Sequence, residues 1–199
     1  CAVVMVTTDK VYQNKEWVYG YREHDRLGGH DPYSASKAAA ELAIASWRSS
    51  FCGLGKHQNP HLRIATARSG NVIGGGDWAE DRIVPDAIRS LAAGQPISVR
   101  NPTATRPWQH VLEPLGGYLL LAQTLVRDPC PPCEPFNFGP TLASNRTVEE
   151  LVTSILSRWP GSWSDECDPL APHEANLLHL QIDKAHHRLG WKPCWDYST

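Results

Sequence analysis

The sequence has 199 residues, of which 41% are hydrophobic and 20% charged, and its formal net charge is −2. This length suits one ordinary domain or part of a larger protein, and the composition is typical of a soluble globular chain. Acids and bases are nearly balanced and interspersed, which gives no sign of a nucleic-acid or membrane surface. No apolar stretch approaches the ~20 residues that cross a bilayer, no secretory signal is visible, and the six cysteines are scattered. We therefore expect a cytoplasmic protein.

Strands and helices alternate along most of the chain. Hydrophobic pattern and cap signals predict, in order, a fully buried strand at 2–8, a helix at 32–50 with Asp31 as N-cap, a strand at 61–74, a helix at 82–93 closed by Gly94, a strand at 96–100, a helix at 113–127, a strand at 135–139, a helix from the Thr147–Glu150 capping box to about 159, a strand at 178–181, and a helix at 183–189 stopped by Gly190. This alternation implies βαβ units, an α/β fold and a parallel sheet. Because it weakens after Gly94, we expect a second, mixed lobe.

The first predicted strand ends in Thr7 and Thr8, followed at once by an acid and a base, Asp9 and Lys10. A strand that delivers such a pair at its tip suggests acid–base chemistry, although an ordinary ion pair at a strand end is the alternative. After a polar loop, Tyr33 and Lys37 lie four residues apart at the start of the next helix, and therefore on one helix face. A lysine ammonium beside a phenol favours the phenolate, which makes a usable acid–base catalyst. The spacing alone is weak evidence, since a solvated helix face shows it too.

In combination, a strand that ends in threonine and a Tyr-x-x-x-Lys at a helix start resemble the extended branch of the short-chain dehydrogenase/reductase superfamily. The resemblance implies that Thr8 positions a sugar hydroxyl and that Tyr33 removes the hydroxyl proton while hydride passes to the nicotinamide of NAD. It also implies that Lys37 binds the nicotinamide ribose, so that Tyr33 and Lys37 are cofactor-binding residues as well as catalytic ones.

The acid and base beside Thr8 indicate a further step. Once C4 of a hexose is a ketone, the C5 hydrogen is acidic, and a base and an acid can together expel the C6 hydroxyl as water. Nucleotide-sugar 4,6-dehydratases do this and carry Thr-Asp-Glu or Thr-Asp-Lys at this place. The resemblance therefore makes Asp9 the acid and Lys10 the base, although a lysine serves as a base only when its pKa is depressed.

Two later stretches, 67–88 and 100–123, are similar to the CDP-glucose 4,6-dehydratase family within that group. By this resemblance Asn71 lines the nucleotide-sugar pocket, and Arg82 and Arg106 lie near the diphosphate. Arginine suits a diphosphate because its planar fork stays charged and makes paired contacts, and a helix N-terminus near Arg82 adds favourable partial charge. Surface solvation of the two arginines is the alternative. The resemblance also implies that the complete protein is a homodimer.

The glycine-rich phosphate loop of dinucleotide-binding folds does not occur in these 199 residues. We therefore expect an incomplete Rossmann-like doubly wound parallel sheet without its N-terminal βαβ units, together with an open strand edge. Residues 1–95 would be the C-terminal part of the NAD-binding domain. Residues 96–199 would be mainly a smaller mixed α/β substrate-binding lobe, with about 105–140 returning to the sheet. The isolated chain should bind NAD weakly or not at all and be inactive.

Three alternatives to the CDP-glucose dehydratase remain open on the sequence. They are a dehydratase of another nucleotide sugar, a 4-epimerase, and a non-catalytic remnant that serves as a binding or dimerisation module. The Cys130–Cys133 pair mimics a redox motif but lies in a proline-rich turn. No His, Cys and Asp cluster has metal-ligand spacing, so no metal site is expected.

Overall fold

A three-stranded parallel sheet forms the first lobe of the computed structural model, which describes residues 1–168 and 176–199. The strands are β1 (Ala2–Val6), β2 (Arg63–Ser69) and β7 (Pro135–Phe138), in the order β1-β2-β7. Both pairs are parallel, with Ala2 opposite Arg63 and Thr66 opposite Pro135. The carboxyl ends of the strands therefore point the same way, and the side chains that follow them gather at one edge.

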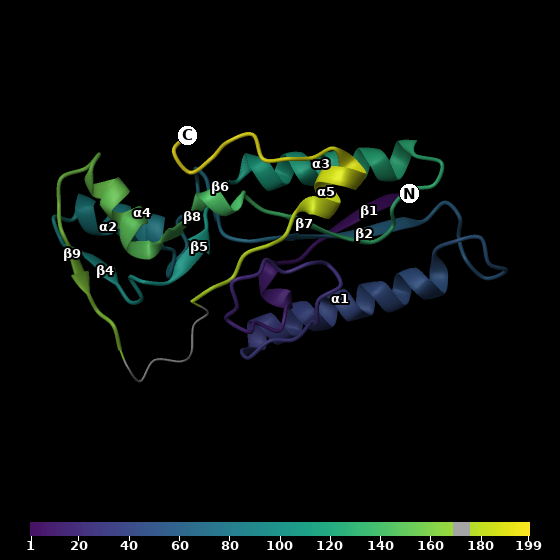
Figure 1. Ribbon diagram of the computed structural model, residues 1–199, viewed down its shortest axis with the longest axis horizontal. Coiled ribbons are helices and arrows are strands. Elements are labelled where there is room, and N and C mark those ends of the chain that lie inside the picture. Colours follow the sequence, from purple (N-terminus) through teal and green to yellow (C-terminus); the bar gives the residue numbers. More distant parts are fainter. Residues whose placement is uncertain (169–175) are drawn as a thin grey trace.

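Helices cover both faces of this sheet. The helix α1 (Pro32–Phe51) lies on one face, and α3 (Leu112–Arg127) and α5 (Asp183–Leu189) lie on the other (Figure 1). The α3 helix approaches the sheet closely, since a Cβ placed on Gly117 would lie 2.3 Å from the Phe138 ring. The core between sheet and helices is apolar and consists of these buried residues: Ala65, Ala67, Leu121, Leu125, Phe136, Phe138, Ala185 and Trp191.

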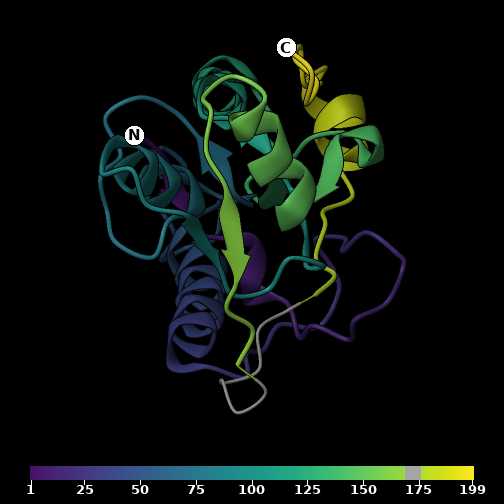
Figure 2. The ribbon, with the colours of Figure 1, turned by 90° about the vertical axis from the view of Figure 1, so that its left-hand side faces the viewer.

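A smaller second lobe lies beyond the sheet and contains α2 (Ile83–Ala92), β4 (Ile97–Val99), α4 (Val148–Leu156) and β9 (Trp163–Asp165). The β4 and β9 strands form a parallel pair, and the lobe has its own apolar cluster: Ala87, Leu91, Ile97, Val99 and Val152. Figure 2 shows this lobe end-on, in front of the sheet, with α1 and α5 on opposite sides of the sheet behind it. The α2 helix precedes residue 95 but packs in this lobe; the two-domain division at 95 stays a prediction.

Short elements connect the two lobes. The strand β3 (Val72–Ile73) pairs in parallel with β6 (Gln109–His110), and β5 (Thr105–Pro107) pairs antiparallel with β8 (Asn145–Thr147). Two 3₁₀ turns complete the described elements, η1 (Asp9–Val11) directly after β1 and η2 (Leu142–Ser144) before β8. The chain therefore leaves the sheet after β2, crosses to the second lobe, and returns through α3 and β7.

Several predicted helix ends are confirmed. The Asp31 side chain caps α1 by accepting a hydrogen bond from the Ser34 backbone N–H at 2.9 Å. Thr147 and Glu150 form the reciprocal capping box of α4. Gly190 ends α5 with a φ of 70°, a conformation that suits glycine.

Three predicted strands differ from the structure. The first is not fully buried: it ends at Val6, and Met5 and Val6 are 42% and 52% exposed, because β1 is an edge strand that pairs only with β2 among the described residues. This is the open edge that the sequence predicts. The strand at 61–74 is two strands in different sheets, because the chain turns away at Gly70. The prediction of a strand at 178–181 is wrong, because that described segment forms no strand and makes a single isolated bridge, between Tyr21 and Leu180.

Candidate active site

A buried polar corner forms where β1 turns into η1. Thr8 is 8% exposed and Asp9 is 3% exposed, although both carry polar side chains. The Thr8 hydroxyl donates a hydrogen bond to Asp9 Oδ1 at 3.0 Å and accepts one from the Lys10 backbone N–H at 3.4 Å. Thr8 thereby caps the 3₁₀ turn and fixes the orientation of the carboxyl group beside it.

Asp9 has an unusually basic carboxyl group. Burial raises its pKa from the ordinary 3.8 to about 6, and the Thr8 hydrogen bond and the charges of Lys10 and Arg106 offset only part of this effect. Its second oxygen, Oδ2, is buried without a hydrogen-bond partner among the residues that the structure describes. A carboxyl group in this state can hold and release a proton near neutral pH.

Gly70 forms one wall of this corner. A Cβ at this position would lie 2.7 Å from Asp9 Oδ2 and 3.2 Å from the Pro107 ring. Only a residue without a side chain lets the backbone after β2 approach the carboxyl group so closely. Gly70 was not predicted from the sequence, because a single glycine after a strand is common in turns of every kind.

Tyr33 and Lys37 lie on one face of α1, as predicted from their spacing. The Lys37 Nζ atom is 5.9 Å from the centre of the Tyr33 ring. The Tyr33 side chain is 52% exposed and Lys37 is half-buried, so both polar groups are accessible. They can therefore contact a bound molecule.

The start of α1 packs on η1, which brings the two predicted stretches together (Figure 1). The two sides are close enough for charges to interact: hydrogen bonds from Ser34 do most to lower the pKa of Asp31, and the charge of Lys10 lowers it further. The Lys10 side chain itself is exposed. The turn that carries Thr8, Asp9 and Lys10 thus borders the first turn of the helix that carries Tyr33.

The three predicted substrate-binding residues occupy different places. Arg106 is 9% exposed in β5, and its charge reaches Asp9. Asn71 is half-buried next to Gly70, between β2 and β3. Arg82 is exposed at the N-cap position of α2 in the second lobe, without a side-chain cap bond. Arg106 is therefore the one whose interaction with the Thr8–Asp9 corner the structure shows.

A second polar group next to Asp9 was missed from the sequence. Gln109 Nε2 donates to Ser69 Oγ at 3.1 Å, and the Tyr118 side chain interacts with the same serine. Burial raises the pKa of Tyr118, and the charge of Asp9 raises it further. These residues come from β2, β6 and α3, and only the folded chain brings them together.

A buried ion pair below the site was also missed. Arg68 on β2 meets Glu41 on α1 with an N–O distance of 2.9 Å, and each side chain is 3% exposed. Each residue taken alone is typical of an ordinary charged position in a helix or a strand. An arginine inside the predicted strand at 61–74 of a parallel sheet is the signal that could have revealed the pair, because a charge buried in a sheet requires a partner.

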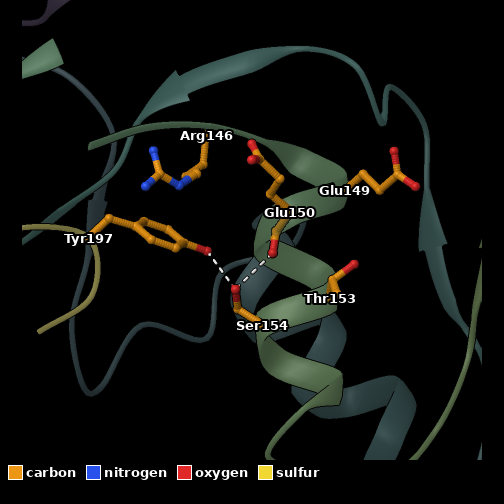
Figure 3. Close-up of a pocket in the computed structure, with 6 residues that line it drawn as sticks. All are labelled: Arg146, Glu149, Glu150, Thr153, Ser154 and Tyr197. Atoms are coloured by element: carbon orange, nitrogen blue, oxygen red, sulfur yellow. Dashed lines mark hydrogen bonds between the residues drawn. The ribbon is translucent and has the colours of Figure 1, made fainter. Parts of the chain in front are cut away.

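The hollow drawn in Figure 3 lies elsewhere, on the second lobe. It measures about 390 Å³ and is lined by residues from β8, α4 and the segment near residue 199: Arg146, Glu149, Glu150, Thr153, Ser154 and Tyr197. The Tyr197 hydroxyl donates to Ser154 Oγ at 3.0 Å, and the Arg146 guanidinium lies 5.0 Å from the Tyr197 ring centre. None of the predicted site residues lines it.

Residues 1–168 and 176–199 contain neither a membrane-spanning helix nor a cluster of metal ligands. No helix there combines the length and apolar character needed to cross a membrane. No group of three or more His, Cys, Asp or Glu side chains in that part of the chain could hold a metal ion.

Residues 2–138 match the sequence profile described as the NAD dependent epimerase/dehydratase family. CDP-glucose 4,6-dehydratase of Salmonella typhimurium is 46% identical over 196 residues, which cover 98% of this chain and 54% of that protein. dTDP-glucose 4,6-dehydratase of Streptomyces antibioticus is 29% identical over 199 residues, covering 98% and 53%. The chain thus spans about half the length of these curated relatives.

Among solved structures, a dTDP-glucose 4,6-dehydratase from Streptomyces venezuelae, crystallised with NAD, superposes with a TM-score of 0.82. The match covers 99% of this chain and 56% of the other at 21% identity. At that identity the likeness shows the fold, which agrees with the α/β arrangement around the parallel sheet.

Proposed function

Because this chain belongs to the NAD dependent epimerase/dehydratase family, we propose that it provides the catalytic residues of a nucleotide-sugar 4,6-dehydratase. The proposed reaction converts CDP-D-glucose to CDP-4-keto-6-deoxy-D-glucose. The 46% identity to the Salmonella typhimurium CDP-glucose 4,6-dehydratase supports this substrate over dTDP-glucose, whose dehydratase is 29% identical.

One observation carries the proposal: the buried Asp9 carboxyl group with a pKa of about 6, held by Thr8 at the carboxyl end of β1. A 4-epimerase needs a base for the C4 hydroxyl but no acid for a departing hydroxyl. An acid that is still partly protonated near neutral pH suits the protonation of the C6 hydroxyl as it leaves. Asp9 therefore favours the dehydratase over the epimerase.

The neighbouring side chains take the other roles. Thr8 orients the C4 hydroxyl, and Tyr33 removes its proton as C4 is oxidised. Lys10 removes the C5 proton once C4 is a ketone, because the resulting anion is delocalised into the carbonyl. Asp9 then protonates the C6 oxygen, so that water leaves, and a proton is returned to C5.

The residues of α1 fit a nicotinamide cofactor. Tyr33 and Lys37 present a hydroxyl and an ammonium group on one accessible helix face, which suits the ribose hydroxyls of NAD. When bound, NAD would supply the oxidation at C4 and the matching reduction at C6. These two residues would hold its ribose, whereas the 199 residues contain no glycine-rich loop for its phosphates.

Arg106, Arg82 and Asn71 would bind the substrate beyond the sugar ring. The role of Arg106 is supported by its charge, which reaches Asp9 from β5, one of the short strands that connect the two lobes. Its charge can stabilise both a diphosphate and the ionised form of Asp9. Arg82, exposed at the start of α2, would contact the same diphosphate from the second lobe.

The complete protein is proposed to be a cytoplasmic homodimer. Leu42 and Trp47 on α1 are 61% and 57% exposed, and large apolar side chains on one helix support an interface there. Sedimentation of the complete protein and of a Trp47→Glu variant tests this. A monomer in the unmodified protein would contradict it.

A chimera tests the function directly. This chain replaces the matching region of the Salmonella typhimurium CDP-glucose 4,6-dehydratase, whose remaining half supplies the rest of the fold. The chimera is incubated with NAD and, separately, with CDP-, dTDP- and UDP-glucose, and the 4-keto sugar is measured. We expect the keto sugar from CDP-glucose.

Three different outcomes would each assign one of the alternatives. Keto sugar from dTDP- or UDP-glucose in preference would assign a different nucleotide, and interconversion at C4 without water loss would assign an epimerase. A folded chimera that binds NAD and CDP-glucose but converts none of the nucleotide sugars would indicate a non-catalytic binding module.

A further inference from the structure

We propose that Glu41 and Arg68 are positioning residues that hold the Thr8 side of the site at a fixed distance from Tyr33 and Lys37, acting through the Thr7 hydroxyl. This inference rests on the proposed function for the roles of Thr8 and Tyr33. It assigns a role to Glu41, Arg68 and Thr7, which do not touch the reacting atoms.

The Glu41 carboxylate uses all its acceptor capacity within the protein. Its Oε1 atom accepts from the Thr7 hydroxyl at 2.6 Å and from Arg68 Nε at 3.0 Å. Its Oε2 atom accepts from the Thr66 hydroxyl at 2.9 Å and from an Arg68 terminal nitrogen at 2.9 Å. Each oxygen thus receives one bond from the guanidinium and one from a threonine on the sheet side.

Glu41 lies on the helix face that carries the predicted catalytic pair. Tyr33, Lys37 and Glu41 follow one another at four-residue spacing along α1, so a contact that fixes Glu41 also fixes the rotation and height of the other two. Tyr33 depends on this contact, because about half of its own side chain faces solvent.

Thr7 carries the connection to the other half of the site. It directly precedes Thr8 and is itself held on the sheet, since its backbone N–H donates to the Ala67 carbonyl at 2.8 Å. The Thr7–Glu41 bond therefore joins the end of β1, where the Thr8–Asp9 corner begins, to the helix that carries Tyr33. Thr66 joins the same carboxylate to the middle of β2, away from the corner.

The arginine is fixed from its other side as well. The second terminal nitrogen of Arg68 donates to the Tyr12 hydroxyl at 2.9 Å and to the Glu23 carbonyl at 3.0 Å. Tyr12 in turn donates to Asn137 on β7 at 2.7 Å. We call the Glu41–Arg68 pair with its Thr7 and Thr66 donors the clamp. The clamp is anchored across the whole sheet and to the segment that follows η1, which makes it rigid.

The matched pair Thr7→Val and Thr66→Val tests this role. Each variant keeps the side-chain shape, removes one hydroxyl donor to Glu41, and leaves one Arg68 N–H on the same oxygen. In the chimera we expect Thr7→Val to lower kcat at least 10-fold with KM changed less than twofold. Thr66→Val should leave kcat within twofold, although both lose a similar amount of stability against urea.

A kinetic isotope effect adds a readout that general destabilisation does not move. With CDP-glucose deuterated at C4, a displaced Tyr33 slows the oxidation step, so Thr7→Val should raise the isotope effect on kcat and Thr66→Val should not. Equal losses of kcat in both variants, or an unchanged kcat in Thr7→Val, would overturn the inference.

Hydrogen exchange of the 199-residue chain separates this inference from the proposed function. Thr7→Val should speed amide exchange over residues 33–37 at least fivefold, and Thr66→Val should not. If the unmodified chimera has no activity while this exchange pattern appears, the dehydratase assignment fails and the clamp stands. Unchanged exchange over 33–37 in Thr7→Val would refute the clamp whatever the chimera does.

Discussion

Two carboxyl groups in this protein are equally shielded from water, and their pKa values move in opposite directions. Asp9 and Glu41 are each 3% exposed. Burial raises the pKa of Asp9 to about 6, and one of its oxygens has no partner among the described residues. Burial acts on Glu41 in the same direction, but the hydrogen bonds and charge of Arg68 and the two threonine donors outweigh it and lower the pKa of Glu41.

The difference shows what each group is suited to do. A carboxylate with four donors around it is stable as an ion and stabilises the fold, because protonation would break those bonds. A carboxyl group with one hydroxyl donor and more distant cations is poorly stabilised as an ion and exchanges its proton near neutral pH. Burial therefore does not assign a role by itself, whereas the set of donors does.

The largest expected effect is on turnover when Asp9 is changed. Asp9→Asn keeps the shape of the side chain but removes the acid, and loss of a general acid costs about 10²- to 10⁴-fold. We expect formation of keto sugar by the chimera to fall by that factor, while oxidation at C4, followed spectroscopically in single-turnover experiments, continues. A variant with near-normal dehydration would remove Asp9 from the mechanism.

The matching change at Glu41 should act on stability. Glu41→Gln leaves the Arg68 charge buried without its ion, and breaking a buried pair in this way costs about 3–5 kcal/mol. Urea denaturation of the chain at pH 7 measures this loss, with exposed Glu80→Gln as the control, expected within about 0.5 kcal/mol.

The same comparison has a pH dependence. Because the native pKa of Glu41 is lowered, its stabilisation is present at pH 7 and is lost as the pH falls from the ordinary 4.5 through the native value. The gap between wild type and Glu41→Gln should close in acid. A gap that persists unchanged to low pH would mean that the ion pair does not cause it.

Asp9→Asn should have the opposite effect on stability. The native pKa of about 6 lies above the ordinary 3.8, so the folded state binds the proton more tightly and wild-type stability falls as the pH rises through this window. At about 1.4 kcal/mol per pKa unit, the variant should gain about 3 kcal/mol at pH 7. The same urea titration at pH 3.5 is the control and should show little gain; a loss of stability at pH 7 would contradict the raised pKa.

The smallest predicted effect concerns the wall of the corner. Gly70→Ala places a methyl group against Asp9 Oδ2 and Pro107, and such overpacking costs about 1–3 kcal/mol. Gly75→Ala in the following turn is the matched control, because its Cβ would meet no atom within 4 Å. Thermal unfolding of both variants gives the comparison, and equal melting temperatures would show that Gly70 has room for a side chain.

The sequence predicted the local elements well and the strand boundaries less well. Asp31, the Thr147–Glu150 box and Gly190 are confirmed because capping depends on a few neighbouring residues. The split of the strand at 61–74 was not predictable, since it depends on how Gly70 meets Asp9 from a distant part of the chain. The exposure of Met5 and Val6 likewise depends on which strands pair with β1.

For the site, the sequence alone predicted which residues carry the proposed chemistry. Thr8, Asp9, Lys10, Tyr33 and Lys37 stand at strand and helix ends, and their resemblance to the motifs of a known family, rather than their spacing alone, points to these roles. Only the tertiary structure decided that the charge of Arg106 acts on Asp9, and that burial raises the pKa of Asp9 above its ordinary value. Only the tertiary structure, too, brought Arg68 to Glu41 as a buried ion pair. The reason is physical: a pKa depends on burial and on charges brought from distant parts of the chain, and no local pattern records which of these will meet.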